Sequence, residues 1–140
     1  MTNMENKELE IYDVRPDKDF AKAVKRLIKK KRFYSLPKQI DELISDLEKG
    51  MFDGDLITHQ DTPTPYDVYK IRLPNPDANV GKSNGYRVIY FVVTESKIVV
   101  LLTIYYKKEQ EEFDEIYING LIDGYFMSGL QLEDTDDDEE

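Results

Sequence analysis

Residues 68–113 decide the fold of this chain, and they read VYKIRL (68–73), PNPDANVGKSNG (74–85), YRVIYFVV (86–93), TES (94–96), KIVVLLTIYY (97–106) and KKEQEEF (107–113). The first, third and fifth segments are rich in β-branched and aromatic residues, which predicts three consecutive β-strands. Cations lie on these strands or beside them, at Lys70, Arg72, Lys82, Arg87, Lys107 and Lys108. A small sheet with a basic face is therefore the feature that a function has to explain.

The charges are divided unevenly along the chain. The net charge is −10, from 29 acidic and 19 basic residues. Residues 133–140, EDTDDDEE, hold seven of the acidic residues and no basic one, so 22 acidic residues remain against 19 basic ones, a balance of −3. An acidic total is weak evidence against nucleic-acid binding when charges are segregated in this way.

The composition excludes several classes of site. A chain without cysteine has no disulfide framework and no thiolate metal site, and a single histidine cannot form an imidazole cluster. We therefore expect no metal and no cofactor. His59 lies in a loop with no partner close in sequence, so it is left out of the candidate site. No apolar run approaches 20 residues and the N-terminus has no signal-peptide core, so we expect a cytoplasmic protein without a membrane partner.

The first half of the chain predicts one strand and two helices. Residues 10–15 alternate and stop at Pro16, which is typical of a short strand. Apolar residues at helical spacing then predict a first helix, at Phe20, Val24, Leu27 and Ile28, and a second one, at Ile40, Leu43, Ile44 and Leu47. Gly50 stops the second helix, and residues 51–67 are expected to form a loop.

A last helix is expected after Lys107–Gln110, which gives the order β-α-α-β-β-β-α. This order predicts an α+β domain, with a helical hairpin packed on a small antiparallel sheet. We expect residues 1–8 to be disordered, residues 9–124 to form the domain, and residues 125–140 to be a C-terminal extension with an acidic disordered tail.

Two patterns within residues 68–93 bear on chemistry. Alternation places Lys70 and Arg72 on one face of their strand, about 7 Å apart, and a neighbouring strand can bring Arg87 beside them. The triplet Gly81-Lys82-Ser83 invites a phosphate-loop interpretation. That motif requires a glycine at position 76, which is proline here, and a helix after the loop, so the interpretation is rejected.

Three segments together resemble the RelE/ParE superfamily of bacterial toxins from type II toxin–antitoxin modules. They are VYKIRL at 68–73, GKSNGYRVIYFV at 81–92 and LLTIYYKKEQEEF at 101–113, and the likeness is to the RelE-like and HigB-like RNA-cleaving branch. The expected order of elements also agrees, so the resemblance covers roughly residues 9–120. It implies a RelE-like fold and an endoribonuclease that cleaves mRNA, often on the ribosome, without a metal.

The resemblance also implies roles for individual residues. Lys70 and Arg72 match cations that act on the ribose 2′-OH or the phosphate, Arg87 matches the arginine that holds the scissile phosphate, and Lys108 matches a phosphate-stabilising arginine. Lys82, Lys107, Tyr105 and Tyr106 are expected to contact RNA. Where the family often has a catalytic tyrosine, the direct register places Asp114, so the general acid stays unassigned.

Two functions remain open. The first is a translation-inhibiting mRNA interferase whose partners are mRNA, the ribosome and a cognate antitoxin protein. The second is a non-catalytic protein of the same fold, either an inactive toxin or a gyrase inhibitor of the ParE type. The dense cations favour the first function, and the acidic tail and the missing tyrosine favour the second.

Two charged segments each have two interpretations. The lysines of the first helix form a solvated face, or they form a surface for phosphate. The acidic segment 133–140 is a solubilising tail, or it is an intramolecular polyanion that competes with RNA for the basic face.

Overall fold

A computed structural model of the chain describes residues 11–57, 64–110 and 114–135. The expectations for residues 1–8, His59, Phe113 and the end of the tail lie outside the described residues. The chain divides into two compact units, Met1–Glu109 and Gln110–Glu140. Each unit is described by itself.

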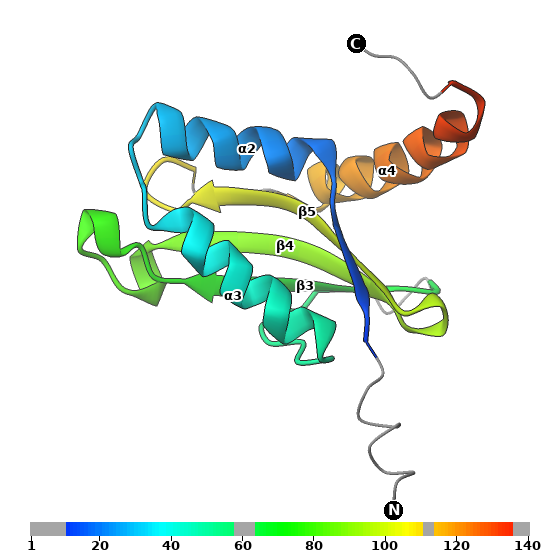
Figure 1. Cartoon of the computed structure of the whole chain (residues 1–140), viewed down its shortest axis with the longest axis horizontal. Helices are drawn as coiled ribbons and strands as arrows, with labels where there is room; N and C mark the ends of the chain where they lie inside the picture. The colour runs from blue at the N-terminus through cyan, green and yellow to red at the C-terminus, as the bar shows by residue number, and fades with distance from the viewer. Residues whose placement is uncertain (1–10, 58–63, 111–113, 136–140) are drawn as a thin grey trace, which may run out of the picture. The chain divides into compact units, whose positions relative to one another are not determined.

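The first unit contains a five-stranded sheet and two helices (Figure 1). Along the chain its elements are β1 (Asp13–Pro16), α2 (Lys18–Lys29), α3 (Leu36–Glu48), β2 (Asp55–Leu56), β3 (Asp67–Leu73), β4 (Tyr86–Val93) and β5 (Ile98–Tyr106). The strand order in the sheet is β1-β5-β4-β3-β2. The α+β class, both helices and the three central strands are therefore confirmed.

The sheet differs from the expectation at its two edges. β1 runs parallel to β5. Parallel neighbours cannot be joined by a tight hairpin, and here the chain passes through α2 and all the following elements before it forms β5. The segment expected to be a loop contains β2, a two-residue strand that pairs antiparallel with β3. Such a short strand has no detectable alternation, so its pairing depends on the neighbouring chain.

The core lies between the sheet and the two helices. Side chains at alternate positions of β4 face the helices and are almost fully buried, at Tyr86, Val88, Tyr90 and Val92. α2 and α3 meet them with apolar residues at helical spacing, at Phe20, Leu27, Leu36, Leu43 and Leu47. Each fully buried leucine or phenylalanine contributes about 1.5–3 kcal/mol, so this layer holds both helices on one face of the sheet.

The loop between β3 and β4 is fixed to the rest of the unit at several points. Asp77 accepts hydrogen bonds from the backbone N–H and the hydroxyl of Ser35, at 2.8 and 3.0 Å, next to the start of α3. Gln39 donates from Nε2 to the carbonyl of Pro74 at 2.8 Å. A Cβ atom at Gly85 would collide with the Leu73 carbonyl oxygen, so the residue there must be glycine. The loop is thus held in one conformation by contacts with α3 and β3.

The second unit contains one described helix, α4 (Glu115–Thr135). The Asp114 carboxylate caps its first turn by accepting a hydrogen bond from the Tyr117 backbone N–H at 2.9 Å. The helix continues past residue 125, and its last three residues belong to the acidic segment 133–140. Among the described helices, none is long and apolar enough to cross a membrane.

Two buried tyrosines of β4 provide a matched pair of stability variants. Tyr90 donates its hydroxyl to the Asp53 carbonyl at 2.6 Å, whereas the Tyr86 hydroxyl has no hydrogen-bond partner among the described residues. We expect Tyr90→Phe to lower the free energy of unfolding by about 1 kcal/mol, because it leaves a carbonyl unpaired. Tyr86→Phe should leave that free energy unchanged or raise it. Urea denaturation of both variants measures the difference, and equal losses would contradict the assignment.

Candidate nucleic-acid interface

Strand register brings three of the predicted site residues together. Arg72 on β3 pairs directly with Arg87 on β4, and Lys70 pairs with Ile89 one step along. The helix-facing positions of β4 are the alternate ones, so Arg87 and its row lie on the sheet face away from α2 and α3. The prediction that a neighbouring strand places Arg87 beside the two β3 cations is therefore confirmed.

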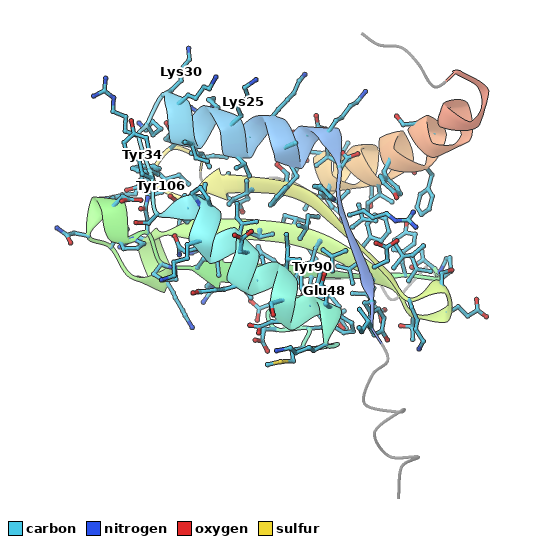
Figure 2. The ribbon with its side chains drawn as sticks, viewed as in Figure 1. Lys25, Lys30, Tyr34, Glu48, Tyr90 and Tyr106 are labelled. Atoms are coloured by element: carbon cyan, nitrogen blue, oxygen red, sulfur yellow. The ribbon has the colours of Figure 1, made fainter. Side chains whose placement is uncertain are left out.

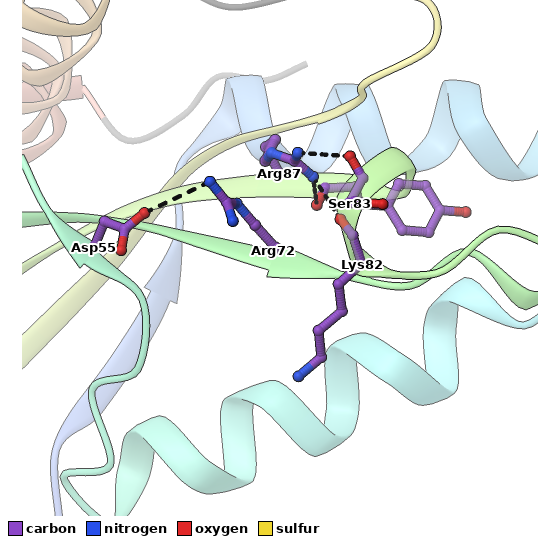
Figure 3. A network of polar contacts seen from close by, with 6 residues as sticks. Asp55, Arg72, Lys82, Ser83 and Arg87 are labelled. Carbon is purple, nitrogen blue, oxygen red and sulfur yellow. Dashed lines mark hydrogen bonds and ion pairs between the residues drawn. The ribbon is translucent and has the colours of Figure 1, made fainter.

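Arg87 is buried, with 4% of its surface exposed, and its guanidinium is bound to the adjacent loop. Nη1 donates to the carbonyls of Lys82 (2.8 Å) and Tyr86 (3.3 Å), and Nη2 donates to the carbonyl of Ser83 (2.9 Å) (Figure 3). These bonds satisfy a buried cation, and they fix the turn that carries Lys82. The side chain of Lys82 is exposed and extends away from Arg87 (Figure 3).

Arg72 has the most accessible cationic group of the strand pair. Its side chain is 54% exposed, and its Nη2 lies 4.0 Å from Oδ2 of Asp55, the residue on β2 that pairs with Lys70. An exposed pair at this distance contributes little energy, so the guanidinium can exchange the carboxylate for a phosphate. Lys70 itself is half-buried.

The remaining predicted cations lie where β5 ends and β4 begins. Lys107 is half-buried and Lys108 is exposed. The Lys107 backbone N–H donates to the Gly85 carbonyl at 2.8 Å, which joins the end of β5 to the loop before β4. Cations from three segments of the chain therefore lie around one end of the sheet, where they can neutralise the charge of a phosphate in a transition state.

The two predicted tyrosines lie on opposite faces of β5. Tyr105 pairs with Arg87 and lies on the cationic face, and it is also buried, with 5% of its surface exposed. Tyr106 lies in the core between sheet and helices, with 8% of its surface exposed and ring contacts to Phe33 (5.2 Å) and Tyr86 (6.0 Å). The expectation that Tyr106 contacts RNA is corrected on this point, because a ring in the core is not available for stacking on a base.

A groove of about 470 Å³ lies between α3, residues 51–55 and the β3 edge of the sheet, and it was not predicted. Three of the site cations line it, Lys70, Arg72 and Lys82, and so do four carboxylates, Glu42, Asp46, Asp53 and Asp55. Its volume falls within the range of small-molecule sites. The sequence carried no local signal for it, because the two walls are about 30 residues apart. In the described part of the chain, no group of three potential metal ligands is close enough to hold an ion.

Glu109 connects the end of β5 to the end of α2. Its carboxylate accepts from Nη2 of Arg26 at 2.7 Å and lies 3.1 Å from Nζ of Lys31. The hydrogen bond from Arg26 holds the pKa of Glu109 below its usual range, and Lys31 acts in the same direction. Glu109 thus fixes the strand end that carries Lys107 and Lys108.

Comparison with known proteins gives similarity to solved structures alone, since no model of a protein family and no curated protein matches the chain. The isolated E. coli RelE toxin is 22% identical over 80% of this chain and 97% of its own, with a TM-score of 0.45. A free E. coli RelE mutant with two arginines changed to alanine is 17% identical over 84% and 97%, with a TM-score of 0.41. Both solved structures are of the E. coli RelE toxin.

The paired arginines of β3 and β4 differ in the stability that they provide. We expect Arg87→Lys to lower the free energy of unfolding by about 1.5–3 kcal/mol, because an ammonium group cannot reproduce the fork to three carbonyls. Arg72→Lys is the matched control, and it should change that free energy by about 0.5 kcal/mol or less because the side chain is exposed. Urea denaturation tests this. An Arg87→Lys protein as stable as wild type would contradict a stabilising role for the three hydrogen bonds of Arg87, which we call the Arg87 clamp.

Glu109 makes a pH-dependent contribution to stability. At pH 7 we expect Glu109→Gln to lower the free energy of unfolding by about 0.5–1 kcal/mol, a partly exposed ion pair being weak. Because the folded pKa is depressed below the usual 4.5, this contribution is complete above pH 4.5 and disappears as the pH falls through the folded pKa. Denaturation at pH 7 and pH 3 measures the change. Glu95→Gln, an exposed carboxylate without an ion pair among the described residues, should show no such dependence.

Proposed function

We propose that this protein is the toxin of a type II toxin–antitoxin module and a metal-independent endoribonuclease that cleaves mRNA. The observation that carries the proposal is the row of Arg72 and Arg87 beside Lys70, on one face of the sheet. Clustered cations at a strand end provide electrostatic stabilisation of a phosphorane, which is the main requirement of this reaction. The similarity of the motifs to the RNA-cleaving branch of the RelE/ParE superfamily supports the same choice.

The proposed reaction is a transfer within the RNA strand. The 2′-oxygen attacks the adjacent phosphorus, the bond from phosphorus to the 5′-oxygen breaks, and the products are a 2′,3′-cyclic phosphate and a 5′-hydroxyl. One proton leaves the 2′-OH and one is delivered to the 5′-oxygen. In our proposal Lys70 and Arg72 face the 2′-OH and the phosphate, and Lys108 offsets the charge of the phosphorane.

Arg87 has an indirect role in this proposal. Its guanidinium is hydrogen-bonded to three carbonyls and is nearly inaccessible to solvent. It therefore fixes the turn that carries Lys82, and its charge adds to the positive potential of the cationic face. Lys82 and Lys107 then bind the flanking phosphates, and Tyr105 lies beside the same row. The partners in this proposal are mRNA on the ribosome and a cognate antitoxin, and the compartment is the cytoplasm.

The second candidate is a binding protein of the same fold without catalytic activity. Two observations favour it: Arg87 is engaged within the protein, and Asp114 caps α4 at the position where the family often has a tyrosine. In that case the cationic face binds a polyanion, or the chain inhibits a target such as gyrase, without breaking a bond.

Replacing Arg72 by glutamine tests the proposal with little effect on folding, because the side chain is exposed. We expect wild-type expression to arrest translation, with new mRNA 5′-hydroxyl ends, and Arg72→Gln to reduce cleavage by about 100-fold, the effect of losing one charge-stabilising group. Mapping of 5′ ends after induction, and with purified ribosomes, gives the readout. Lys49→Gln, an exposed lysine at the end of α3, is the control and should cleave like wild type.

Arg87→Ala is a weaker test, because it removes the clamp and destabilises the fold. If wild-type protein binds ribosomes or RNA but leaves no new 5′ ends, the second candidate replaces the first. If Arg72→Gln cleaves as fast as wild type, the proposed site is wrong.

A further inference from the structure

Four lysines form a stripe on the exposed side of α2. Lys18, Lys22, Lys25 and Lys29 are spaced by four, three and four residues, so they share one helix face, and all four are exposed. We call them the α2 stripe. Figure 2 shows Lys25 pointing away from the sheet, as does Lys30, which follows the end of α2 and is not part of the stripe. From Lys18 to Lys29 the stripe covers 12 residues, about 16 Å along the helix axis.

Carboxylates oppose the charge of the stripe only weakly within the described part of the chain, where Lys18 has an electrostatic interaction with the neighbouring Asp17. None of its four lysines has an ion-pair partner among the described residues. The two neighbouring cations that do have one, Arg26 and Lys31, share the single carboxylate of Glu109. Like charges three and four residues apart destabilise a helix, so helix stability does not explain the stripe.

The second helix on the same sheet face has the opposite charge. α3 carries exposed or half-buried acidic residues, at Asp41, Glu42, Asp46 and Glu48, against one lysine, Lys38. A solubilising surface would mix both signs on both helices. The segregation instead places a basic helix and an acidic helix on the same sheet face. A polyanion can therefore bind α2 only in orientations that keep it away from the carboxylates of α3.

We propose that the α2 stripe binds the phosphate backbone of a structured RNA at a surface separate from the cleavage site. α2 packs on the sheet face opposite Lys70 and Arg72, so a strand in the proposed site does not run across the stripe. In a duplex, a length of about 16 Å presents on the order of five phosphates per strand, which four lysines can contact without reading sequence.

This inference rests on the proposed function and adds a second RNA-binding surface to it. Two binding surfaces on one molecule act together if a single RNA assembly offers both a single strand and a structured backbone, because the second contact is then intramolecular. The stripe therefore supplies affinity for the assembly, while the sheet face supplies chemistry. A short single-stranded RNA engages the sheet face alone.

The test compares two double variants of the full chain that remove the same charge. Lys22→Gln/Lys25→Gln removes half of the stripe, and Lys38→Gln/Lys49→Gln removes the exposed lysine of α3 and the exposed lysine that directly follows this helix. Binding to purified ribosomes is measured from 50 to 300 mM salt. We expect the stripe variant to reduce the slope of log affinity against log salt by about 2, near one unit per lysine, and the α3 variant to keep the wild-type slope.

Cleavage of a short single-stranded RNA at saturating concentration is the second readout, and it should be the same for wild type and for both variants. Equal salt slopes in the two variants would overturn the proposal, as would a loss of short-RNA cleavage in the stripe variant alone. If the wild-type protein cleaves no RNA but the salt slope still depends on the stripe lysines, RNA binding by the stripe is supported and the proposed endoribonuclease activity is wrong. The two failures are therefore distinguishable.

Discussion

The guanidinium of Arg87 is the interaction on which the cationic end of the sheet depends. A buried cation must find acceptors, and here the carbonyls of Lys82, Ser83 and Tyr86 supply them. The turn before β4 is consequently fixed, Gly85 can lie against the β3 carbonyl, and β5 is joined to the same turn through Lys107. The carbonyl dipoles stabilise the charge of Arg87 without removing it, which offsets part of the repulsion between Arg72 and Arg87 directly across two strands.

Much of the fold could be predicted, because its elements carry local periodicity. Residues 86–93 alternate between core and cationic face, and the apolar spacing of α2 and α3 survives intact in the structure. The features that could not be predicted depend on distant pairing. β2 has two residues, too few for a pattern, and the parallel pairing of β1 with β5 joins segments about 85 residues apart. The weak apolar pattern of residues 114–135 predicts neither the cap at Asp114 nor the length of α4.

The candidate site divides in the same way. The common face of Lys70, Arg72 and Arg87 follows from the two-residue period of a strand once the strands are paired. The core position of Tyr106 does not follow, because a register shift between Ile89 and Tyr90 changes which residues of β5 face the helices. The burial of Arg87 depends on the carbonyls of the adjacent loop, which no strand pattern predicts. The groove beside α3 and the contacts of Glu109 with α2 are likewise properties of the assembled unit.

The distribution of charge explains how a chain of net charge −10 can present surfaces for RNA. At physiological salt the screening length is about 8 Å, so a phosphate close to α2 or to the sheet end is affected by the nearest side chains far more than by acidic groups elsewhere. Among the described residues, Arg72 has one weakly held ion-pair partner, the Asp55 carboxylate at 4.0 Å, and the lysines of the α2 stripe have none. At lower salt the screening is weaker, and the net negative charge then opposes the approach of RNA in orientations that do not present the basic surfaces. An acidic chain with segregated cations is therefore selective in orientation, which a uniformly basic protein of the same fold is not.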